Sequence, residues 1–197
     1  MNRINIEKRE EKKKIILNKS KELFIKRGYN ETKVEDITRE LGISKGNFYT
    51  YFNSKEEVLC EILETGKRES REMLDKIDIS RSPSEILWEY FKFKIECFLE
   101  RFKKINLKFL DEILKNEKIK SAKRELHEME ITFLEENVFS KYEVTSDRFM
   151  SEYIYSSLEY FLFNEVLEDR IGTEATYVER KKEDLKKIIS FIDRGLK

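Results

Sequence analysis

Apolar residues recur at intervals of three and four along most of the chain, which is the period of an amphipathic α-helix. A single proline and six glycines interrupt the 197 residues, so little in the sequence stops helices from forming. We therefore expect an all-α protein. The expected helices cover residues 15–27, 32–41, 44–52, 55–77, 83–103, 106–114, 118–139, 147–168 and 176–196.

Two short helices around a glycine are predicted between Thr32 and Phe52. Thr32 and Glu35 have the spacing of a capping box at the start of the first helix, and Gly42 supplies a residue that can end it. Ser44 is a second N-cap candidate and opens the next helix. Two helices joined by such a turn form a helix-turn-helix.

The outward face of the second helix indicates which partner this unit would bind. Phe48 and Phe52 lie four residues apart on one side, and we expect them to be buried against the preceding helix. The opposite side carries small, polar and hydroxyl-bearing groups: Lys45, Gly46, Asn47, Tyr49 and Thr50, with Tyr51 near the boundary. Such groups suit contacts with base edges and phosphates of DNA. The alternative is an ordinary surface helix in an α-helical protein.

Residues 16–59 resemble the DNA-binding domain of the tetracycline-repressor (TetR) family of bacterial transcription regulators. The similarity is carried by Ile16-Leu17, Leu23-Phe24, Gly28-Tyr29, Thr32, Asp36-Ile37, Leu41-Gly42-Ile43-Ser44, Lys45-Gly46-Asn47-Phe48-Tyr49-Thr50-Tyr51-Phe52 and Ser54-Lys55-Glu56-Glu57. Ser20 and Thr38 stand where the family usually has alanine, and Asn47 stands where threonine is common. A hydroxyl at those two buried sites can bond back to its own helix.

The resemblance implies a DNA-contact surface in which some residues contact bases and others contact phosphates. The expected contact residues are Thr32, Lys33, Ser44, Lys45, Gly46, Asn47, Tyr49, Thr50, Tyr51 and Lys55. Among them we expect Asn47 and Tyr49 to influence base preference. Thr32, Lys45, Tyr51 and Lys55 would mainly hold phosphates. The basic arm of residues 1–14 is either a frayed helix start or a further contact to the DNA backbone.

We expect two domains, a DNA-binding domain over residues 1–55 and a helical effector-binding and dimerisation domain over residues 56–197. The helix from residue 55 to 77 is the only mechanical link that we expect between them. Eighteen of the 24 aromatic residues follow position 60. Such rings usually fill a core, but in the resembled family a small-molecule inducer binds among the middle helices. The expected lining, suited to a hydrophobic or aromatic effector, is Trp88, Phe91, Phe98, Phe109 and Tyr160.

The last two expected helices carry wide apolar stripes. Either stripe could close the core of its own domain, but their width also suits a four-helix bundle between two subunits, which is how the family forms homodimers. The expected interface residues are Tyr153, Ser157, Phe161, Leu185, Ile189 and Ile192.

Charge is distributed unevenly although the formal net charge of the chain is zero. Residues 1–60 hold 14 basic against 10 acidic residues, so the remainder carries a net negative charge. A basic N-terminal part on an acidic body is compatible with nucleic-acid binding. Enzyme chemistry is poorly supported, because His127 is the sole histidine and no glycine-rich phosphate loop is present. We expect no cofactor and no metal.

The remaining sequence features concern location. Cys60 and Cys97 lack a disulfide or metal spacing and are expected to be reduced. No signal peptide or membrane-length apolar run is visible, so we expect a soluble cytoplasmic protein. The leading hypothesis is a homodimeric repressor that a small hydrophobic ligand releases from its DNA operator. The alternatives are an effector-free or protein-controlled, nucleoid-type DNA binder, and an enzyme acting in the bundle.

Overall fold

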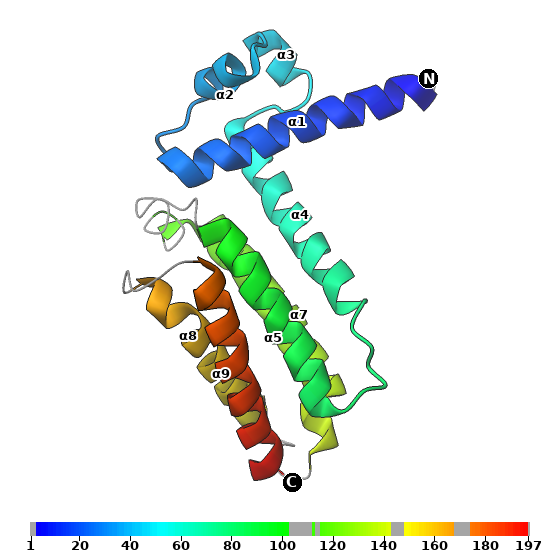
Figure 1. Cartoon of the computed structure of the whole chain (residues 1–197). Helices are drawn as coiled ribbons and strands as arrows, with labels where there is room; N and C mark the ends of the chain where they lie inside the picture. Colours follow the sequence, from blue (N-terminus) through cyan, green and yellow to red (C-terminus); the bar gives the residue numbers. More distant parts are fainter. Residues whose placement is uncertain (1–2, 103–111, 113–114, 143–147, 168–173, 197) are drawn as a thin grey trace. The chain divides into compact units, whose positions relative to one another are not determined.

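The computed structural model describes residues 3–102, 112, 115–142, 148–167 and 174–196, and these residues form helices and turns without a β-strand (Figure 1). The elements are α1 (Arg3–Arg27), α2 (Val34–Leu41), α3 (Lys45–Tyr49), α4 (Lys55–Leu74), α5 (Pro83–Phe102), α7 (Glu117–Asn137), the 3-10 turn η1 (Phe139–Lys141), α8 (Arg148–Leu167) and α9 (Glu174–Gly195). The all-α prediction is confirmed. The helix expected at residues 106–114 lies outside the described residues, except for Glu112.

The chain folds into two compact units. Unit 1 comprises residues 1–69 and 102–124, and unit 2 comprises residues 70–101 and 125–197. The boundary therefore falls inside α4 and again inside α7, so both helices have residues in both units. The expectation that the helix beginning at Lys55 is the only link is wrong, because α7 also runs from one unit into the other. The predicted domain boundary after residue 55 stays a prediction.

Unit 1 is built around a small core that holds α1 to α4 together. Phe48 and Phe52 are almost fully buried with Ile37, as the four-residue spacing predicts. Ser20 and Thr38 are buried as well, and their hydroxyls donate to backbone carbonyls of their own helices at 2.7 and 3.1 Å. These two departures from the TetR pattern are therefore accommodated without an unpaired polar group.

The turns of unit 1 follow the predicted cap chemistry in all but one place. Gly42 adopts φ +64° at the C-terminus of α2, the left-handed conformation that favours glycine. The predicted Thr32–Glu35 capping box is wrong, because the N-cap of α2 is Lys33. The Asp36 carboxylate accepts the Lys33 backbone N–H at 3.0 Å, and this bond holds the pKa of Asp36 below its usual value.

Helix α1 is longer than the sequence pattern suggests. It begins at Arg3, so most of the basic arm is a regular helical extension and not a frayed start, while the alternative of a contact to the DNA backbone stays a prediction. Lys13 ties this extension to the rest of unit 1, since its amine lies 3.2 Å from Glu61 and 5.5 Å from the centre of the Phe52 ring.

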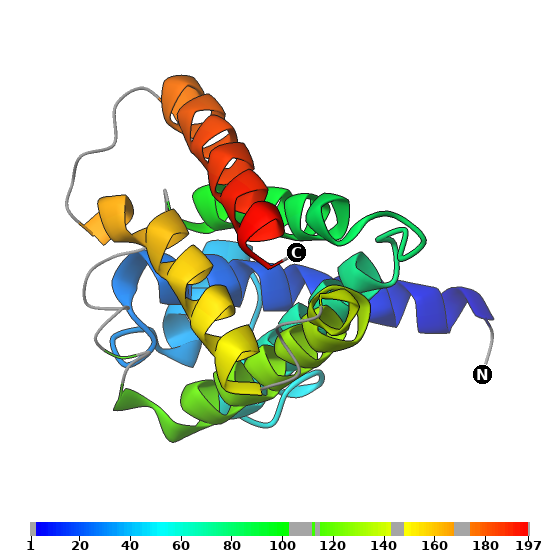
Figure 2. The same ribbon diagram turned by 90° about the horizontal axis from the view of Figure 1, so that it is seen from below.

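Unit 2 is a bundle in which α5, α7, α8 and α9 run side by side (Figures 1 and 2). The end of α4 joins the same core through Met73 and Leu74. Large side chains fill the interior, including Tyr90, Phe91, Phe139 and Tyr155. No helix among the described residues is long and apolar enough to cross a membrane.

Gly28 allows a direct test of the turn between α1 and α2. Its φ is +97°, and a Cβ added there would lie 3.1 Å from an oxygen of Glu112. Gly28→Ala should therefore destabilise the protein by about 1–3 kcal/mol. Gly66→Ala is the matched control, because Gly66 lies inside α4 with open space around it and should gain about 0.5–1 kcal/mol. Urea unfolding followed by circular dichroism measures both, and equal stabilities would contradict the strain at Gly28.

Candidate nucleic-acid interface

The short helix α3 is held in place at its start and at its centre. The Ser44 hydroxyl accepts the Asn47 backbone N–H at 3.1 Å, which confirms the predicted N-cap. Phe48 faces the core with no exposed surface. The structure thus fixes which side of α3 faces outward, although the helix is shorter than the residues 44–52 expected from the sequence.

The outward side of α3 carries most of the residues expected to contact DNA. Tyr49 is half exposed, and Tyr51 is partly buried against the core of unit 1. The Thr50 hydroxyl donates to the Gly46 carbonyl at 3.0 Å, which leaves its methyl group for apolar contacts. The exposed members of the expected set are Lys33, Ser44, Lys45, Gly46, Asn47, Tyr49 and Thr50.

Lys45 makes an ion pair with Glu35 of α2 across the surface. The hydrogen bond between them raises the pKa of Lys45 and lowers the pKa of Glu35. Both side chains are more than half exposed, and such pairs contribute little to stability. Lys45 can therefore exchange Glu35 for another anion at small cost.

Two residues of the expected contact set are engaged inside unit 1. Thr32 is fully buried, and its hydroxyl donates to the Gly28 carbonyl at 2.7 Å, which corrects its expected role as a phosphate contact. The Lys55 amine donates to the Tyr29 carbonyl at 2.6 Å and lies 4.2 Å from the centre of the Tyr29 ring. Burial lowers the pKa of Lys55. Its amine is therefore bonded within the protein.

Glu112 is a residue of this region that sequence reasoning missed. Its carboxylate accepts the backbone N–H of Tyr29 at 2.5 Å and that of Asn30 at 3.2 Å. The contact joins residues more than 80 positions apart. No local pattern in the sequence connects such distant positions, and one glutamate among many carries no signal by itself.

The three described residues of the set expected to line an effector cavity do not gather around one space. Trp88 lines a surface groove of about 290 Å³ with Lys186 of α9, whose amine lies 4.9 Å from the centre of the indole ring. Phe91 is fully buried in the core, whereas Tyr160 is 69% exposed, so its assignment to a cavity stays a prediction. The side chains of Phe98 and Phe109 lie outside the described residues.

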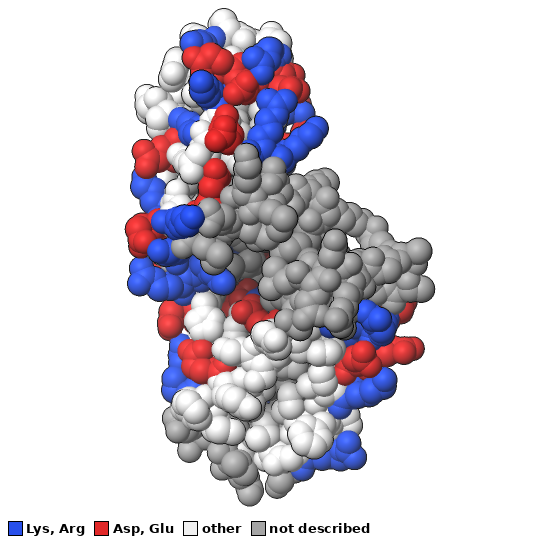
Figure 3. Space-filling model, turned by 90° about the vertical axis from the view of Figure 1, so that its left-hand side faces the viewer, with Lys and Arg blue, Asp and Glu red and all other residues white. Residues whose placement is uncertain are grey.

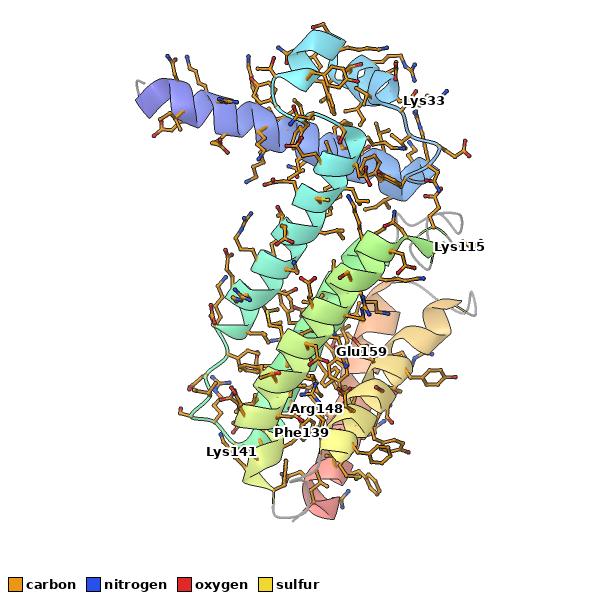
Figure 4. All side chains as sticks on the ribbon, turned by 180° about the vertical axis from the view of Figure 1, so that it is seen from behind. Lys33, Lys115, Phe139, Lys141, Arg148 and Glu159 are labelled. Atoms are coloured by element: carbon orange, nitrogen blue, oxygen red, sulfur yellow. The ribbon has the colours of Figure 1, made fainter. Side chains whose placement is uncertain are left out.

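A buried polar cluster in unit 2 was not foreseen either. The Lys94 amine donates to Glu130 at 2.7 Å, to Glu159 at 2.6 Å and to the Tyr155 hydroxyl at 2.8 Å, and Figure 4 shows Glu159 inside the bundle. One ammonium faces two carboxylates, and burial in this surrounding raises the pKa of Tyr155. The cluster joins α5, α7 and α8, so it specifies how these helices align.

His127 lies in the same region of unit 2. Its Nε2 lies 2.8 Å from Glu152, and its ring meets the Tyr155 ring edge to face at 4.9 Å. No group of three metal-ligand side chains occurs in the part of the chain that the structure describes. Cys60 is a free thiol, and the side chain of Cys97 lies outside that part.

The expected dimer residues divide between the core and the surface of unit 2. Leu185 and Ile189 are buried by their own subunit, which corrects their assignment to an intersubunit interface. Phe161 and Ile192 are partly buried against the same core. Tyr153 and Ser157 are exposed.

An uncharged surface runs along the outer side of α8. Phe149, Tyr153 and Tyr160 recur at helical spacing there and are each more than 60% exposed, and Phe191 of α9 is 71% exposed. Figure 3, which views the side on which α8 lies in Figure 1, shows much of this part of unit 2 without charged residues. Exposed rings in a row are typical of an interaction surface.

Comparisons with known proteins agree with this geometry. Residues 16–62 match the model of bacterial regulatory proteins of the tetR family. YuxN of Bacillus subtilis, an uncharacterized HTH-type transcriptional regulator, is 49% identical over 53 residues, which are 27% of this chain and 18% of YuxN. The HTH-type transcriptional regulator QacR of Staphylococcus aureus is 42% identical over 64 residues, 32% of this chain and 34% of QacR. The chain thus spans well under half the length of these two curated relatives.

A solved structure covers nearly the whole chain. The transcriptional regulator of the TerR/AcrR family from Aquifex aeolicus aligns with a TM-score of 0.68 at 28% identity, covering 91% of this chain and 98% of that protein. These relatives are all described as transcriptional regulators.

The cap of α3 gives a testable consequence. Ser44→Ala should cost about 0.5–2 kcal/mol, because the Asn47 N–H loses its partner at the start of a helix with only five residues. Thr50→Ala removes a neighbouring exposed hydroxyl that bonds back to its own helix, so it should stay within about 0.5 kcal/mol of the parent protein. Amide hydrogen exchange of residues 45–49 reports both changes, and equal exchange in the two variants would show that the cap is dispensable.

Proposed function

We propose that this chain, which belongs to the tetR family of bacterial regulatory proteins, binds double-stranded DNA through α3 and regulates transcription from the bound site. The observation that carries the proposal is the outer face of α3, where polar side chains project from a helix fixed by Ser44 and Phe48. A helix held in this way can enter the major groove and contact base edges.

The roles of the exposed residues follow from their chemistry. Asn47 can pair bidentately with adenine, and the methyl group of Thr50 can contact thymine. Gly46 has no side chain, so the backbone at the start of α3 can approach the DNA closely. Lys33 and Lys45 hold phosphates, Lys45 by exchanging its partner Glu35. Thr32 is not among the DNA contacts, because its hydroxyl is bonded inside unit 1. Lys55 contributes indirectly, by holding the Tyr29 carbonyl in the turn between α1 and α2.

A homodimer completes the binding site. One short helix contacts too few bases to select a site in a genome, whereas a two-fold dimer presents two such helices to major grooves about 34 Å apart or a multiple of that distance. The uncharged surface of α8, with Tyr153 and Tyr160, supports a two-fold contact in which this face packs on its copy.

Regulation by a small effector completes the proposal. The protein acts in the cytoplasm as a repressor, and an effector bound in unit 2 lowers its affinity for the operator. The membership in the tetR family supports this step. The described aromatic residues do not enclose one apolar space, so the proposal names no lining.

Selection from random duplexes tests the function. The full-length protein should enrich a palindromic site, and a footprint on that site should require both half-sites. Loss of the footprint on adding compounds from a metabolite set would support the effector step. A specific footprint that no compound alters would favour the effector-free DNA binder, and absence of any sequence preference would overturn the proposed function.

Two substitutions on α3 separate base selection from phosphate binding. Asn47→Ala should change relative affinities by about 1–3 kcal/mol for each base pair that Asn47 discriminates. Lys45→Ala should weaken all sequences alike and lower the salt slope by about 0.9 for each protomer. Lys120→Ala, on the exposed start of α7, is the control with an unchanged slope. Selected sites identical to those of the parent protein would remove Asn47 from base recognition.

Substitutions that place a negative charge on the outer side of α8 test the proposed dimer surface. Tyr153→Glu and Tyr160→Glu should each give monomers that remain helical. A carboxylate buried in an apolar interface destabilises that interface by a free energy on the order of several kcal/mol. Ile79→Glu introduces the same charge at another exposed apolar position of unit 2 and should leave the dimer intact. Sedimentation velocity measures the three variants, and dimers in all of them would place the interface elsewhere.

A further inference from the structure

The N-terminal end of α7 is attached to the turn between α1 and α2 through a chain of hydrogen bonds. Asn116 caps α7, since its side-chain oxygen accepts the backbone N–H groups of Lys118 and Ile119 at 3.0 and 3.2 Å. The Asn116 backbone N–H donates in turn to the Glu112 carbonyl at 2.9 Å. The start of α7 is thus bonded directly to Glu112.

The Glu112 side chain continues this chain of bonds to the α1–α2 turn. Its carboxylate accepts the N–H groups of Tyr29 and Asn30, while Lys55 donates to the Tyr29 carbonyl. The peptide group before Tyr29 is therefore held by the anion, and the peptide group after it by both ions, since Glu112 accepts its N–H and Lys55 donates to its carbonyl. Hydrogen bonds to charged groups are stronger than neutral ones, so this arrangement fixes the turn firmly.

Two further contacts attach the first turns of α7 to the rest of unit 1. Ile119 is buried in the core of unit 1 together with Phe48 and Phe52. Lys118 lies 3.0 Å from Glu56 at the start of α4. The first turns of α7 therefore move with the helices that carry the candidate DNA-binding face.

The rest of the same helix belongs to unit 2. Ile131 and Leu134 are fully buried in the core of unit 2, and Glu130 is part of the Lys94 cluster. A continuous helix of 21 residues transmits displacement along its axis, because every turn is hydrogen-bonded to the next. A rearrangement around Glu130 can therefore reach Glu112.

We propose that Glu112 is a positioning residue that couples unit 2 to the DNA-binding helices, by joining the N-terminal end of α7 to the backbone of Tyr29 and Asn30. The inference rests on the proposed function, since coupling has a meaning only if unit 1 binds DNA. It assigns to Glu112 a role beyond capping a turn. Because coupling between two sites is reciprocal, DNA bound to unit 1 must alter unit 2 through the same contact.

The selected duplex serves as the probe, so the effector need not be known. In the parent dimer, bound duplex should change amide hydrogen exchange of residues 125–137 by at least about fivefold, the lower end of typical coupling. In Glu112→Ala that distant change should disappear, while protection of residues 45–49 by DNA persists. The Tyr29 and Asn30 amides should exchange at least about tenfold faster without DNA, since each loses a charge-assisted bond.

Matched variants distinguish coupling from a loss of stability. Glu117→Ala removes a carboxylate from the same segment, one that pairs with Lys120 three residues on, and it should behave as the parent protein. Glu112→Gln keeps an acceptor oxygen without the charge, so it should retain part of the change in hydrogen exchange of residues 125–137. If Glu112→Ala unfolds, Glu112→Gln is used in its place. Thermal unfolding checks that the variants compared have similar stability.

The outcomes separate the two proposals. A parent protein that binds no duplex overturns the proposed function. A parent protein that binds duplex without any change in residues 125–137 overturns the coupling role alone. The coupling role is equally overturned if Glu112→Ala, with its Tyr29 amide released, still transmits the full change.

Discussion

Burial of Phe48 is the interaction on which the candidate interface depends. A helix of five residues cannot hold its own conformation in water, because too few hydrogen bonds offset the cost of starting it. Helix α3 exists because its central ring is fully enclosed by unit 1 and because Ser44 accepts the amide of Asn47 in its first turn. Everything that α3 presents outward is therefore set by the core behind it. The same dependence makes the α1–α2 turn important, since Tyr29 and Phe24 pack ring against ring beside that core.

The sequence was informative wherever a feature depends on neighbours along the chain. Apolar spacing gave the described helices to within about three residues, except that α1 begins at Arg3 instead of residue 15. Gly42 was correctly placed in a left-handed turn, and Ser44 was correctly identified as a cap. The exception at α2 has a physical reason. Thr32 is of a residue type that often caps helices, but its hydroxyl donates to the buried carbonyl of Gly28. Lys33 is therefore the N-cap of α2, and the Asp36 carboxylate accepts its backbone N–H.

Features that depend on distant contacts could not be predicted in the same way. Lys55, Lys94 and Glu112 are charged residues in a chain rich in charges, and their pattern is that of solvated helix faces. Their actual partners come from other helices, at separations that no local spacing encodes. The C-terminal stripes left two alternatives open for a related reason. Period alone cannot tell which of two apolar faces is inside, and the structure buries Leu185 and Ile189 while leaving Tyr153 outside.

The placement of these distant contacts bears on how a helical regulator can respond to a signal. Helix α7 contributes to both cores, with Ile119 in the core of unit 1 and Leu134 in the core of unit 2. Both helices also lead toward the helix-turn-helix, α4 from the segment after α3 and α7 from the residues bonded to Glu112 at the turn before α2. Under the proposed function, a change among the side chains of unit 2 therefore has two helices along which it can affect unit 1, and the sequence alone indicated only the first of them.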